Sequence, residues 1–205
     1  SVNNLNDNSP SITSSASYSA DENQTSVGTV TATDADGDDV TFTISGSDLS
    51  ITSSGVITFD SEPDYESTNS YSETVTASDG TNSSTQEITI SVNNVNEPPT
   101  AISLSASAIN ENDLGAVVGT ITTTDEDADD TVEYSLSGTD AESFEVVDGQ
   151  LRLKSDVSAD YETKTSYSVT VTVTDSGGLT TSNGFTVSVN NLNDNSPSIT
   201  SSASY

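Results

Sequence analysis

The 205-residue sequence predicts an all-β protein built from two tandem β-sandwich domains. Three observations carry this prediction: apolar and polar residues alternate over short stretches, turn signals separate those stretches, and the sequence repeats internally. No stretch shows the spacing of apolar residues that an amphipathic helix requires.

Strand-like alternation is clearest where β-branched or aromatic residues take turns with small polar ones. The four clearest stretches are VGTVTAT at 27–33, VTFTI at 40–44, YSETVTA at 71–77 and FTVSV at 185–189. Such a pattern buries one face of a strand and leaves the other face in water. Turns are expected between strands at Asp36-Gly37, Asp79-Gly80, Asp148-Gly149 and Gly177-Gly178.

Internal repeats define the domain organisation. The string SVNNLNDNSPSITSSASY stands at both 1–18 and 188–205. Inside that long period, VGTVTATDADGDDVTFTISG from Val27 resembles VGTITTTDEDADDTVEYSLSG from Val118, and DYESTNSYSETVTASDG from Asp64 resembles DYETKTSYSVTVTVTDSGG from Asp160. We therefore expect domains at 11–97 and 98–195, each of about seven strands, between the tail of a preceding repeat at 1–10 and the start of a following one at 196–205.

Composition excludes several classes of function. The chain has 33 Asp and Glu residues against 3 Lys and Arg, a formal net charge of −30. Such a charge excludes nucleic acid and anionic membrane surfaces as partners. No apolar run is long enough for direct membrane insertion or for a secretory signal.

Cysteine and histidine are both absent, which excludes disulfides, thiolate metal sites and a histidine general base. Apolar residues make up only 30% of the chain, so each core is expected to be thin. An extracellular β-domain without disulfides needs another source of stability, and bound metal ions are the obvious one.

Acidic motifs follow the same order in both domains. The densest of them is TDEDADD at 124–130, where like charges repel unless water or a cation separates them. A solvated loop and a site for a hard cation are the two interpretations. The order favours the cation, because each domain has an early Glu beside Asn, then DxD, then DYE, then an Asp at a strand end, then an Asn-rich linker.

With these motifs in this order, the chain resembles the cadherin repeat family over both domains. In the first domain the matching motifs are Glu22, Asp34-Ala35-Asp36, Asp64-Tyr65-Glu66, Asp79 and Asn94-Val95-Asn96-Glu97-Pro98. In the second they are Glu111, Asp125-Glu126-Asp127, Asp160-Tyr161-Glu162, Asp175 and Asn191-Leu192-Asn193-Asp194-Asn195. The resemblance implies two Greek-key, immunoglobulin-like sandwiches of cadherin type, with Ca²⁺ bound at each junction between consecutive repeats.

The resemblance also implies which residues bind calcium. At the central junction they are Glu22, Asp64, Glu66, the Val95 carbonyl, the Asn96 side chain, Glu97, the Pro98 carbonyl, Asp125, Asp127 and Asp175. Terminal half-sites are implied at Asn6, the Asn8 carbonyl, Asp34, Asp36 and Asp79, and at Glu111, Asp160, Glu162, the Leu192 carbonyl, Asn193 and Asp194. Three Ca²⁺ ions, the family's usual number, would balance six of the seven carboxylate charges of the central junction. Independently of the family, Ca²⁺ suits these residue types, because it takes about 6–8 oxygen ligands in irregular geometry, whereas Mg²⁺ demands a tighter shell.

The implied function is that of a calcium-rigidified segment of a bacterial adhesion protein, secreted or at the cell surface, with neighbouring repeats of the same array as partners. Serine- and threonine-rich strands, few basic residues and missing cysteines are typical of bacterial arrays. The alternative is a calcium-dependent carbohydrate-binding module of a secreted polysaccharide-degrading system, which an exposed row of tyrosines would favour. A polysaccharide or a cell-surface ligand is the further partner expected. No enzyme is expected, because every acidic pair recurs in both domains and is explained by the linker sites.

Overall fold

The structure, a computed structural model, describes residues 5–128 and 130–196. The chain divides into two compact units, Ser1–Val95 and Asn96–Tyr205, each with its own core. Strands make up nearly all of the regular structure, and the part described contains no α-helix, only the single-turn 3₁₀ helix η1 (Ala141–Ser143). The all-β prediction is therefore confirmed.

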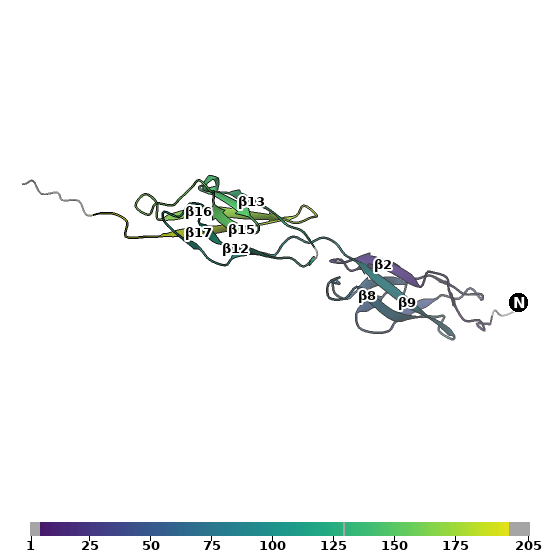
Figure 1. Cartoon of the computed structure of the whole chain (residues 1–205). Helices are drawn as coiled ribbons and strands as arrows, with labels where there is room; N and C mark the ends of the chain where they lie inside the picture. The colour runs from purple at the N-terminus through teal and green to yellow at the C-terminus, as the bar shows by residue number, and fades with distance from the viewer. Residues whose placement is uncertain (1–4, 129, 197–205) are drawn as a thin grey trace, which may run out of the picture. The chain divides into compact units, whose positions relative to one another are not determined.

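The strands of the first unit form two main sheets. They are β1 (Ser11–Ile12), β2 (Ser17–Asp21), β3 (Ser26–Thr29), β4 (Ala32–Thr33), β5 (Thr41–Ile44), β6 (Leu49–Ile51), β7 (Val56–Phe59), β8 (Ser70–Ser78) and β9 (Ser83–Asn93). One sheet has the order β2-β9-β8-β5, the other the order β3-β7-β6, and β1 pairs with β4 beside them. Figure 1 shows β2, β9 and β8 side by side in the purple and blue part of the chain.

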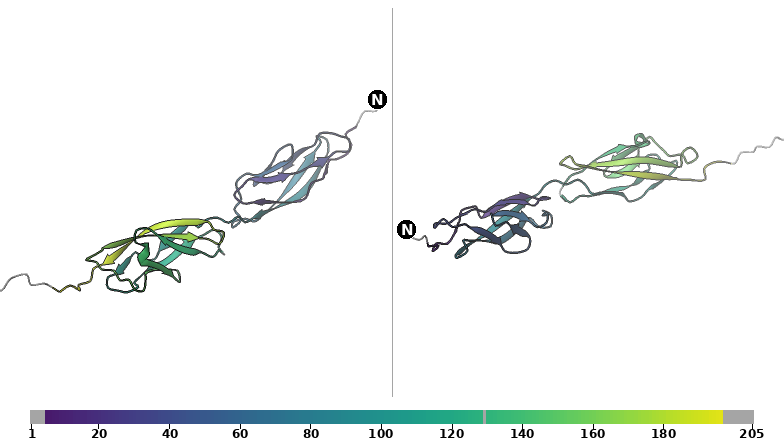
Figure 2. Two further views of the ribbon diagram at one scale, coloured as in Figure 1. Left: turned by 90° about the horizontal axis from the view of Figure 1, so that it is seen from above. Right: turned by 180° about the vertical axis from the view of Figure 1, so that it is seen from behind.

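The strands of the second unit form two four-stranded sheets. They are β10 (Ala101–Leu104), β11 (Ala108–Asn110), β12 (Val117–Thr124), β13 (Glu133–Ser137), β14 (Phe144–Val147), β15 (Gln150–Leu153), β16 (Ser166–Thr174) and β17 (Thr180–Asn190). The sheets have the orders β10-β12-β15-β14 and β11-β17-β16-β13. The views in Figure 2 show the long hairpin of β16 and β17 in green and yellow.

An early strand lies beside the last strand in each unit, which is the arrangement of a Greek-key sandwich. β2 runs parallel to β9, with Ser17 opposite Thr89, and β11 runs parallel to β17, with Ala108 opposite Ser188. The other pairs of both units are antiparallel. The predicted Greek-key sandwiches are confirmed, and the parallel pair brings the residue after β2 or β11 next to the linker that leaves the unit.

Alternation along the strands builds the cores. In β9, Ile88, Ile90 and Val92 are buried, while the residues between them are exposed. In β16 the same alternation buries Tyr167, Val169, Val171 and Val173. These positions contribute to a core of buried residues in each unit, and each Å² of apolar surface that they bury stabilises the fold by about 25 cal/mol.

The hairpin of β14 and β15 follows the turn prediction. Asp148 has φ of 51° and Gly149 has φ of 71°, so both central residues are left-handed. Two left-handed residues form a type I′ turn, whose twist matches that of the flanking strands. Asp and Gly are the residues that adopt this conformation at the least cost.

One predicted strand differs between the two units. The stretch 27–33 is not a single strand, because β3 ends at Thr29 and β4 begins at Ala32. Between them Val30 is buried and its N–H donates to the Gly55 carbonyl at 2.8 Å. The equivalent β12 stays continuous, pairing with β15 at its start and with β10 towards its end. In both units this stretch therefore pairs with two different strands, and its first pairing contains a register shift; only the first unit also has a break in the strand.

The ends of the chain stay partly outside the structure. Residues 5–10 of the predicted preceding tail have no regular structure, and residues 1–4 lie outside the described residues. Of the predicted following repeat at 196–205, only Ser196 is described. The two compact units meet at Val95 and Asn96, close to the predicted boundary between 97 and 98. The predicted domain limits stay predictions.

Candidate metal centres

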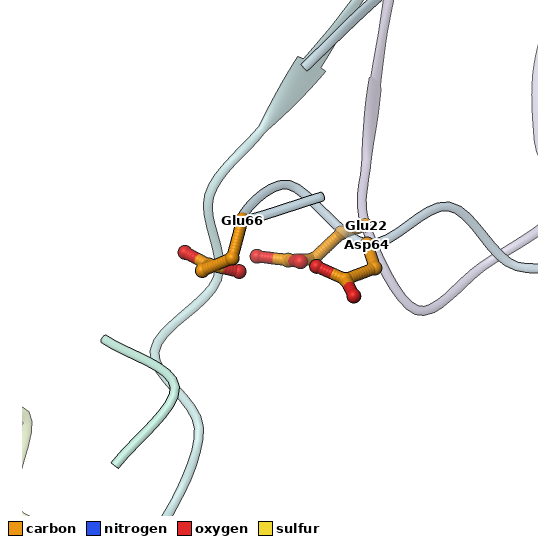
Figure 3. A group of neighbouring side chains, drawn as sticks. All are labelled: Glu22, Asp64 and Glu66. Atoms are coloured by element: carbon orange, nitrogen blue, oxygen red, sulfur yellow. The ribbon is translucent and has the colours of Figure 1, made fainter. Parts of the chain in front are cut away.

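Three carboxylates gather where the chain leaves the first unit. Glu22 follows β2 directly, while Asp64 and Glu66 lie in the turn segment between β7 and β8. One carboxylate oxygen of each lies within 4.8 Å of the others. Figure 3 shows the Glu22 carboxylate lying between those of Asp64 and Glu66. We call such a group, next to the linker that leaves a unit, the C-side set.

Glu22 is the buried centre of this set, with an exposure of only 4%. Its Oε2 accepts the Tyr65 N–H at 2.7 Å, and its Oε1 accepts the Val95 N–H at 2.7 Å. Hydrogen bonds to a charged acceptor are stronger than neutral ones. The side chain therefore ties the DYE turn to the linker from inside the unit.

Asp64 and Glu66 are exposed and held by neutral donors. The hydroxyl of Ser67 donates to Asp64 Oδ2 at 2.7 Å and its N–H donates to Oδ1 at 3.0 Å. These bonds hold the pKa of Asp64 below its usual value. Asn94 Nδ2 donates to Glu66 Oε1 at 2.9 Å, which a carboxylate at position 94 could not do.

The second unit repeats this arrangement with one change. Glu111 has an exposure of 1%, and it accepts the Tyr161 N–H at 2.8 Å and the Leu192 N–H at 2.6 Å. Its carboxylate groups with those of Glu162 and Asp194 within 4.8 Å. Asp160 is not a member of that group. Thr163 donates to both of its oxygens, as Ser67 does to those of Asp64, and these bonds lower the pKa of Asp160.

Linker residues contact this second C-side set. Asn112 Nδ2 donates to Asp194 Oδ2 at 2.7 Å, and Asn191 Nδ2 reaches Glu162 Oε1 at 3.4 Å. The Leu192 carbonyl accepts the Asp194 N–H at 2.9 Å. Asn193 is exposed. The predicted residues Glu111, Glu162 and Asp194 are thus brought together, whereas Asn193 is only near them in sequence.

A second kind of group, the N-side set, lies next to the linker that precedes each unit. In the first unit the linker is attached to Asp36, whose Oδ2 accepts the N–H groups of Asp7 at 3.0 Å and Asn8 at 2.8 Å. Asn8 Nδ2 also donates to Asp36 Oδ1 at 2.9 Å. These bonds, led by the backbone of Asn8, hold the pKa of Asp36 below its usual value.

Asn82 completes the attachment of this linker. Its Nδ2 donates to Asn6 Oδ1 and to the Asn8 carbonyl, both at 3.1 Å. Its N–H and that of Thr81 donate to Asp79 Oδ1 at 2.6 and 2.7 Å, which lowers the pKa of Asp79. Asn6, Asn8, Asp36 and Asp79 are therefore in one connected network, and Asp34 joins it by accepting the Asp36 N–H at 2.8 Å.

Several oxygens of this set are buried without a hydrogen-bond donor. They are Asp34 Oδ2, Asp38 Oδ2 and Asp79 Oδ2. Loss of solvent at Asp38, followed by the nearby charges of Asp34, Asp36 and Asp79, raises the pKa of Asp38. A carboxylate oxygen removed from water needs a donor or a cation.

In the second unit, Asn96 and Glu97 begin the N-side set. The Glu97 N–H donates to Asp127 Oδ2 at 2.9 Å, and Asn96 Nδ2 donates to Asp175 Oδ2 at 3.0 Å. Pro98, which has no N–H, is exposed and cannot repeat the bond that Asn8 makes. Asp175 is buried, with an exposure of 5%. Its burial raises the pKa, but bonds from Asn96 and from the Leu179 N–H outweigh that effect, so the pKa is lowered.

Asp125, Asp130 and Asp175 come within 4.8 Å of one another in this set. Asp125, Asp127 and Asp130 also line a cavity of 360 Å³ whose apolar wall includes Tyr134. Asp125 Oδ2 and Asp130 Oδ2 are buried and accept no hydrogen bond. Burial, together with the charges of Asp127, Asp130 and Asp175, raises the pKa of Asp125.

No basic side chain neutralises the four sets within the described chain. The two ion pairs there are Arg152 with Glu145, at 2.9 Å, and Lys164 with Asp140. Both use acids outside the sets. Lys164 Nζ also lies 4.9 Å from the centre of the Tyr167 ring, where it makes a cation–π contact.

Comparison with known proteins identifies the family. The family described as "Cadherin domain" matches residues 105–190, and the one described as "Bacterial Ig domain" matches residues 6–91. "Cadherin EGF LAG seven-pass G-type receptor 2" of Mus musculus, like its Homo sapiens counterpart, is 31% identical over 218 residues, which is 94% of this chain and 7% of the receptor. The chain consists of cadherin-like repeats.

Solved structures agree with this family at the level of the fold. The crystal structure of human protocadherin-24 EC1-2 in its second form superposes with a TM-score of 0.71 at 23% identity, over 88% of this chain and 98% of that one. A protocadherin gammaB7 EC3-6 cis-dimer structure matches with a TM-score of 0.62 at 26% identity, over 91% of this chain and 49% of that one. Cadherin-like repeats are extracellular, adhesion-type domains, and this chain has their fold.

The tyrosines of the cadherin-like repeats serve the cores. Tyr18, Tyr65 and Tyr71 pack against the core of the first repeat, and Tyr134 and Tyr161 against that of the second. Tyr167 is buried. Among the described residues there is thus no exposed row of tyrosines such as stacking on a sugar would need.

Three residues of the cadherin-like sites belong to none of the family motifs. Asp38 and Asp130 join the N-side carboxylates, and Asn82 holds the first linker. The acidic residues that follow DxD in DADGDD and in DEDADD could have indicated Asp38 and Asp130. Nothing in the sequence singles out Asn82.

No helix in the described ranges is long and apolar enough to cross a membrane.

Proposed function

We propose that the C-side and N-side sets bind Ca²⁺ and that the chain is a calcium-rigidified pair of repeats in an extracellular adhesion protein. The main observation behind this proposal is that carboxylate oxygens in these groups are buried and have no hydrogen-bond donor. Asp34, Asp79 and Asp125 each have such an oxygen. Cadherin domains in general bind calcium at the linkers between repeats.

The chemistry of the donors fits calcium. Carboxylates of Asp and Glu, amide oxygens of Asn and backbone carbonyls are the hard oxygen ligands that Ca²⁺ takes in numbers of about 6–8. The proposed ligands at the central junction are Glu22, Asp64, Glu66, the Val95 carbonyl, Asn96, Glu97, the Pro98 carbonyl, Asp125, Asp127 and Asp175. Calcium would supply charge neutralisation there, while Glu22 and Asp175 hold the linker by accepting hydrogen bonds from Val95 and Asn96.

Chain connectivity supports a shared central junction. Val95 donates its N–H to the C-side set of the first repeat, and the next residue, Asn96, donates to the N-side set of the second. One peptide bond joins the two sets. Metal bound in each set would restrict the backbone torsions of the linker residue that the set holds, which is the proposed mechanical role.

The proposal places the parent protein at a bacterial cell surface or in its secretions, with neighbouring repeats of the array as partners. The match of residues 6–91 to a family described as "Bacterial Ig domain" supports a bacterial origin. The net charge of −30 and the absence of cysteine support it further. The carbohydrate-binding alternative lacks the exposed tyrosines that would favour it, and we propose no catalytic role for the acidic residues.

Isothermal titration calorimetry with Ca²⁺ on the chelator-treated chain tests this function. We expect saturable binding that Asp79→Asn removes from the first repeat and Asp175→Asn removes from the second. Asp48→Asn, which neutralises an exposed aspartate outside the sets, is the matched control and should bind like the parent chain. Absence of calcium binding at millimolar concentration would overturn the proposed function.

The calcium affinity measured in this titration is expected to depend on pH through Asp125. Because burial and nearby charge raise its pKa, Asp125 takes up a proton at higher pH than an exposed aspartate does. Protons therefore compete with calcium there first as the pH falls, and the affinity of the second N-side site should decline before that of the C-side sets. Asp125→Asn should abolish this early step.

Gly177 permits the contact between Asn96 and Asp175. A Cβ at position 177 would lie 2.3 Å from Asn96 Oδ1 and 2.4 Å from its Cγ, so the Asn96 side chain would have to move. We expect Gly177→Ala to weaken calcium binding at the second N-side site by about tenfold, roughly 1.4 kcal/mol, in calorimetry. Gly184→Ala is the control, because the Cβ it adds has its nearest neighbour at 3.9 Å. Equal affinities for both variants would mean that Asn96 is not a ligand.

A further inference from the structure

We propose that Asp38 and Asp130 are metal ligands, so that each N-side site has one more carboxylate than the DxD and strand-end aspartates supply, and that this carboxylate gives the site a preference for cations of high charge. The proposal rests on the calcium-binding function proposed above. Asp38 and Asp130 both lie outside the family motifs, and their proposed role is in the selection of the cation.

In the first repeat, the geometry of the loop directs Asp38 into the site. Asp34 Oδ1 accepts the N–H of Asp36 at 2.8 Å and that of Asp38 at 3.4 Å, which curls the loop around the first aspartate. Asp34, Asp36 and Asp38 are half-buried, and one oxygen of each lies within 4.8 Å of the others. The intervening residues, like Asp39 after them, are exposed. The loop thus presents three carboxylates to one point.

One oxygen of the Asp38 carboxylate lacks a hydrogen-bond donor. Its Oδ2 is buried and accepts no hydrogen bond, as is also true of Asp34 Oδ2 and Asp79 Oδ2. Three buried, donor-free oxygens from three aspartates repel one another. A cation coordinated by all three would remove both the repulsion and the missing hydrogen bonds.

In the second repeat, Asp130 reaches the equivalent place by a different loop. Three residues stand between Asp34 and Asp38, whereas four stand between Asp125 and Asp130. Despite the extra residue, Asp130 lies within 4.8 Å of Asp125 and the buried Asp175. Ser176 Oγ donates to Asp130 Oδ1 at 2.7 Å, which leaves the buried Oδ2 without a donor. Two loops of unequal length that place an aspartate at the same site point to a shared ligand role.

The negative charge of this additional ligand affects which cation the site prefers. In the first repeat, Asp34, Asp36, Asp38 and Asp79 contribute four negative charges. Calcium affinity in oxygen sites rises with the number of charged ligands. A trivalent lanthanide has the same preference for hard oxygens and gains more from each added charge. The sites should therefore prefer Tb³⁺ to Ca²⁺, and Ca²⁺ to Mg²⁺, more strongly than three-carboxylate sites would.

The first experiment compares Asp38→Ala with Asp39→Ala in the full chain by calcium calorimetry. The two residues are neighbours of identical charge, so long-range electrostatics are matched and only the local position differs. We expect Asp38→Ala to weaken the N-side site of the first repeat about tenfold and Asp39→Ala less than twofold. Asp38→Asn, which keeps an oxygen but loses the charge, should fall between them.

The second experiment uses Tb³⁺ luminescence sensitised by tyrosine. Tyr134 lines the same cavity as Asp125, Asp127 and Asp130, so Tb³⁺ bound there should emit on tyrosine excitation, and Tyr134→Phe should remove that emission. We expect Asp130→Ala to require about tenfold more Tb³⁺ for this signal than the control Glu126→Ala, whose residue is exposed in the same loop. Circular dichroism of each variant reports whether the fold is kept.

The outcomes separate this proposal from the proposed function. Should Asp79→Asn abolish binding while Asp38→Ala matches Asp39→Ala, Asp38 is no ligand and the calcium function stands. Equal terbium titrations for Asp130→Ala and Glu126→Ala would overturn the assignment of Asp130. Absence of any calcium binding by the parent chain would instead overturn the function itself.

Discussion

Millimolar calcium is expected to raise the melting temperature of the chelator-treated chain by more than about 10 °C. Ions that bind only the folded state stabilise it by about 2.7 kcal/mol per site when their concentration is a hundred times the dissociation constant. In a domain of this size, 1 kcal/mol shifts the melting temperature by about 4–8 °C. The effect is large because thin cores leave little stability of other origin, and because the metal removes repulsion between buried carboxylates such as Asp34 and Asp79.

Differential scanning calorimetry measures this shift, with magnesium at the same concentration as the ionic-strength control. Magnesium should produce a much smaller shift, because it demands a tighter octahedral shell and holds its own water. The double variant Asp79→Asn with Asp175→Asn should respond less than the parent chain. A melting temperature independent of calcium would contradict a structural role for the metal.

The second large effect is expected at Glu111. Its replacement by alanine leaves the N–H groups of Tyr161 and Leu192 without their acceptor, in a place where the side chain is 1% exposed. Hydrogen bonds to a charged group contribute about 1.5–3 kcal/mol each, and an unsatisfied buried donor costs more than the bond alone. We therefore expect the free energy of unfolding of the second repeat to fall by about 3–5 kcal/mol.

Urea denaturation in the presence of chelator measures this loss without interference from metal. Glu111→Gln keeps the shape and one acceptor oxygen, so its loss should be smaller. Glu126→Ala, at an exposed glutamate of the same unit, is the control and should change the unfolding free energy by less than about 0.5 kcal/mol. A loss at Glu111→Ala no larger than at this control would mean that the linker and the DYE turn are held by other contacts.

Glu22 offers the same test in the first repeat, since it accepts the N–H groups of Tyr65 and Val95 in the same way. The buried glutamate is therefore a structural residue even before any metal is considered. Its motif position was evident from the sequence, but its two backbone partners were not, because they lie 43 and 73 residues away in the chain.

The sequence by itself determined the features that depend on neighbouring residues. Period-two alternation identified strands such as β9 and β16, because burial on one face of a strand repeats every second residue. The Asp148-Gly149 pair identified a hairpin turn, because few residues adopt two successive left-handed conformations. The order of the acidic motifs likewise identified the family, because the order can be read along the chain without knowing the distances between the side chains.

Tertiary structure alone decided which of these carboxylates meet. Asp160 matches the DYE motif but bonds to Thr163 and stays outside the Glu111 group, whereas Asp130, which ends the TDEDADD stretch but belongs to none of the family motifs, joins Asp125 and Asp175. Sequence spacing could not reveal this, because loops with three and with four residues between the two aspartates reach the same site. The physical reason is that the sheet pairings of each sandwich, together with local hydrogen bonds, set the positions of residues far apart in the chain, and a metal site depends on those positions.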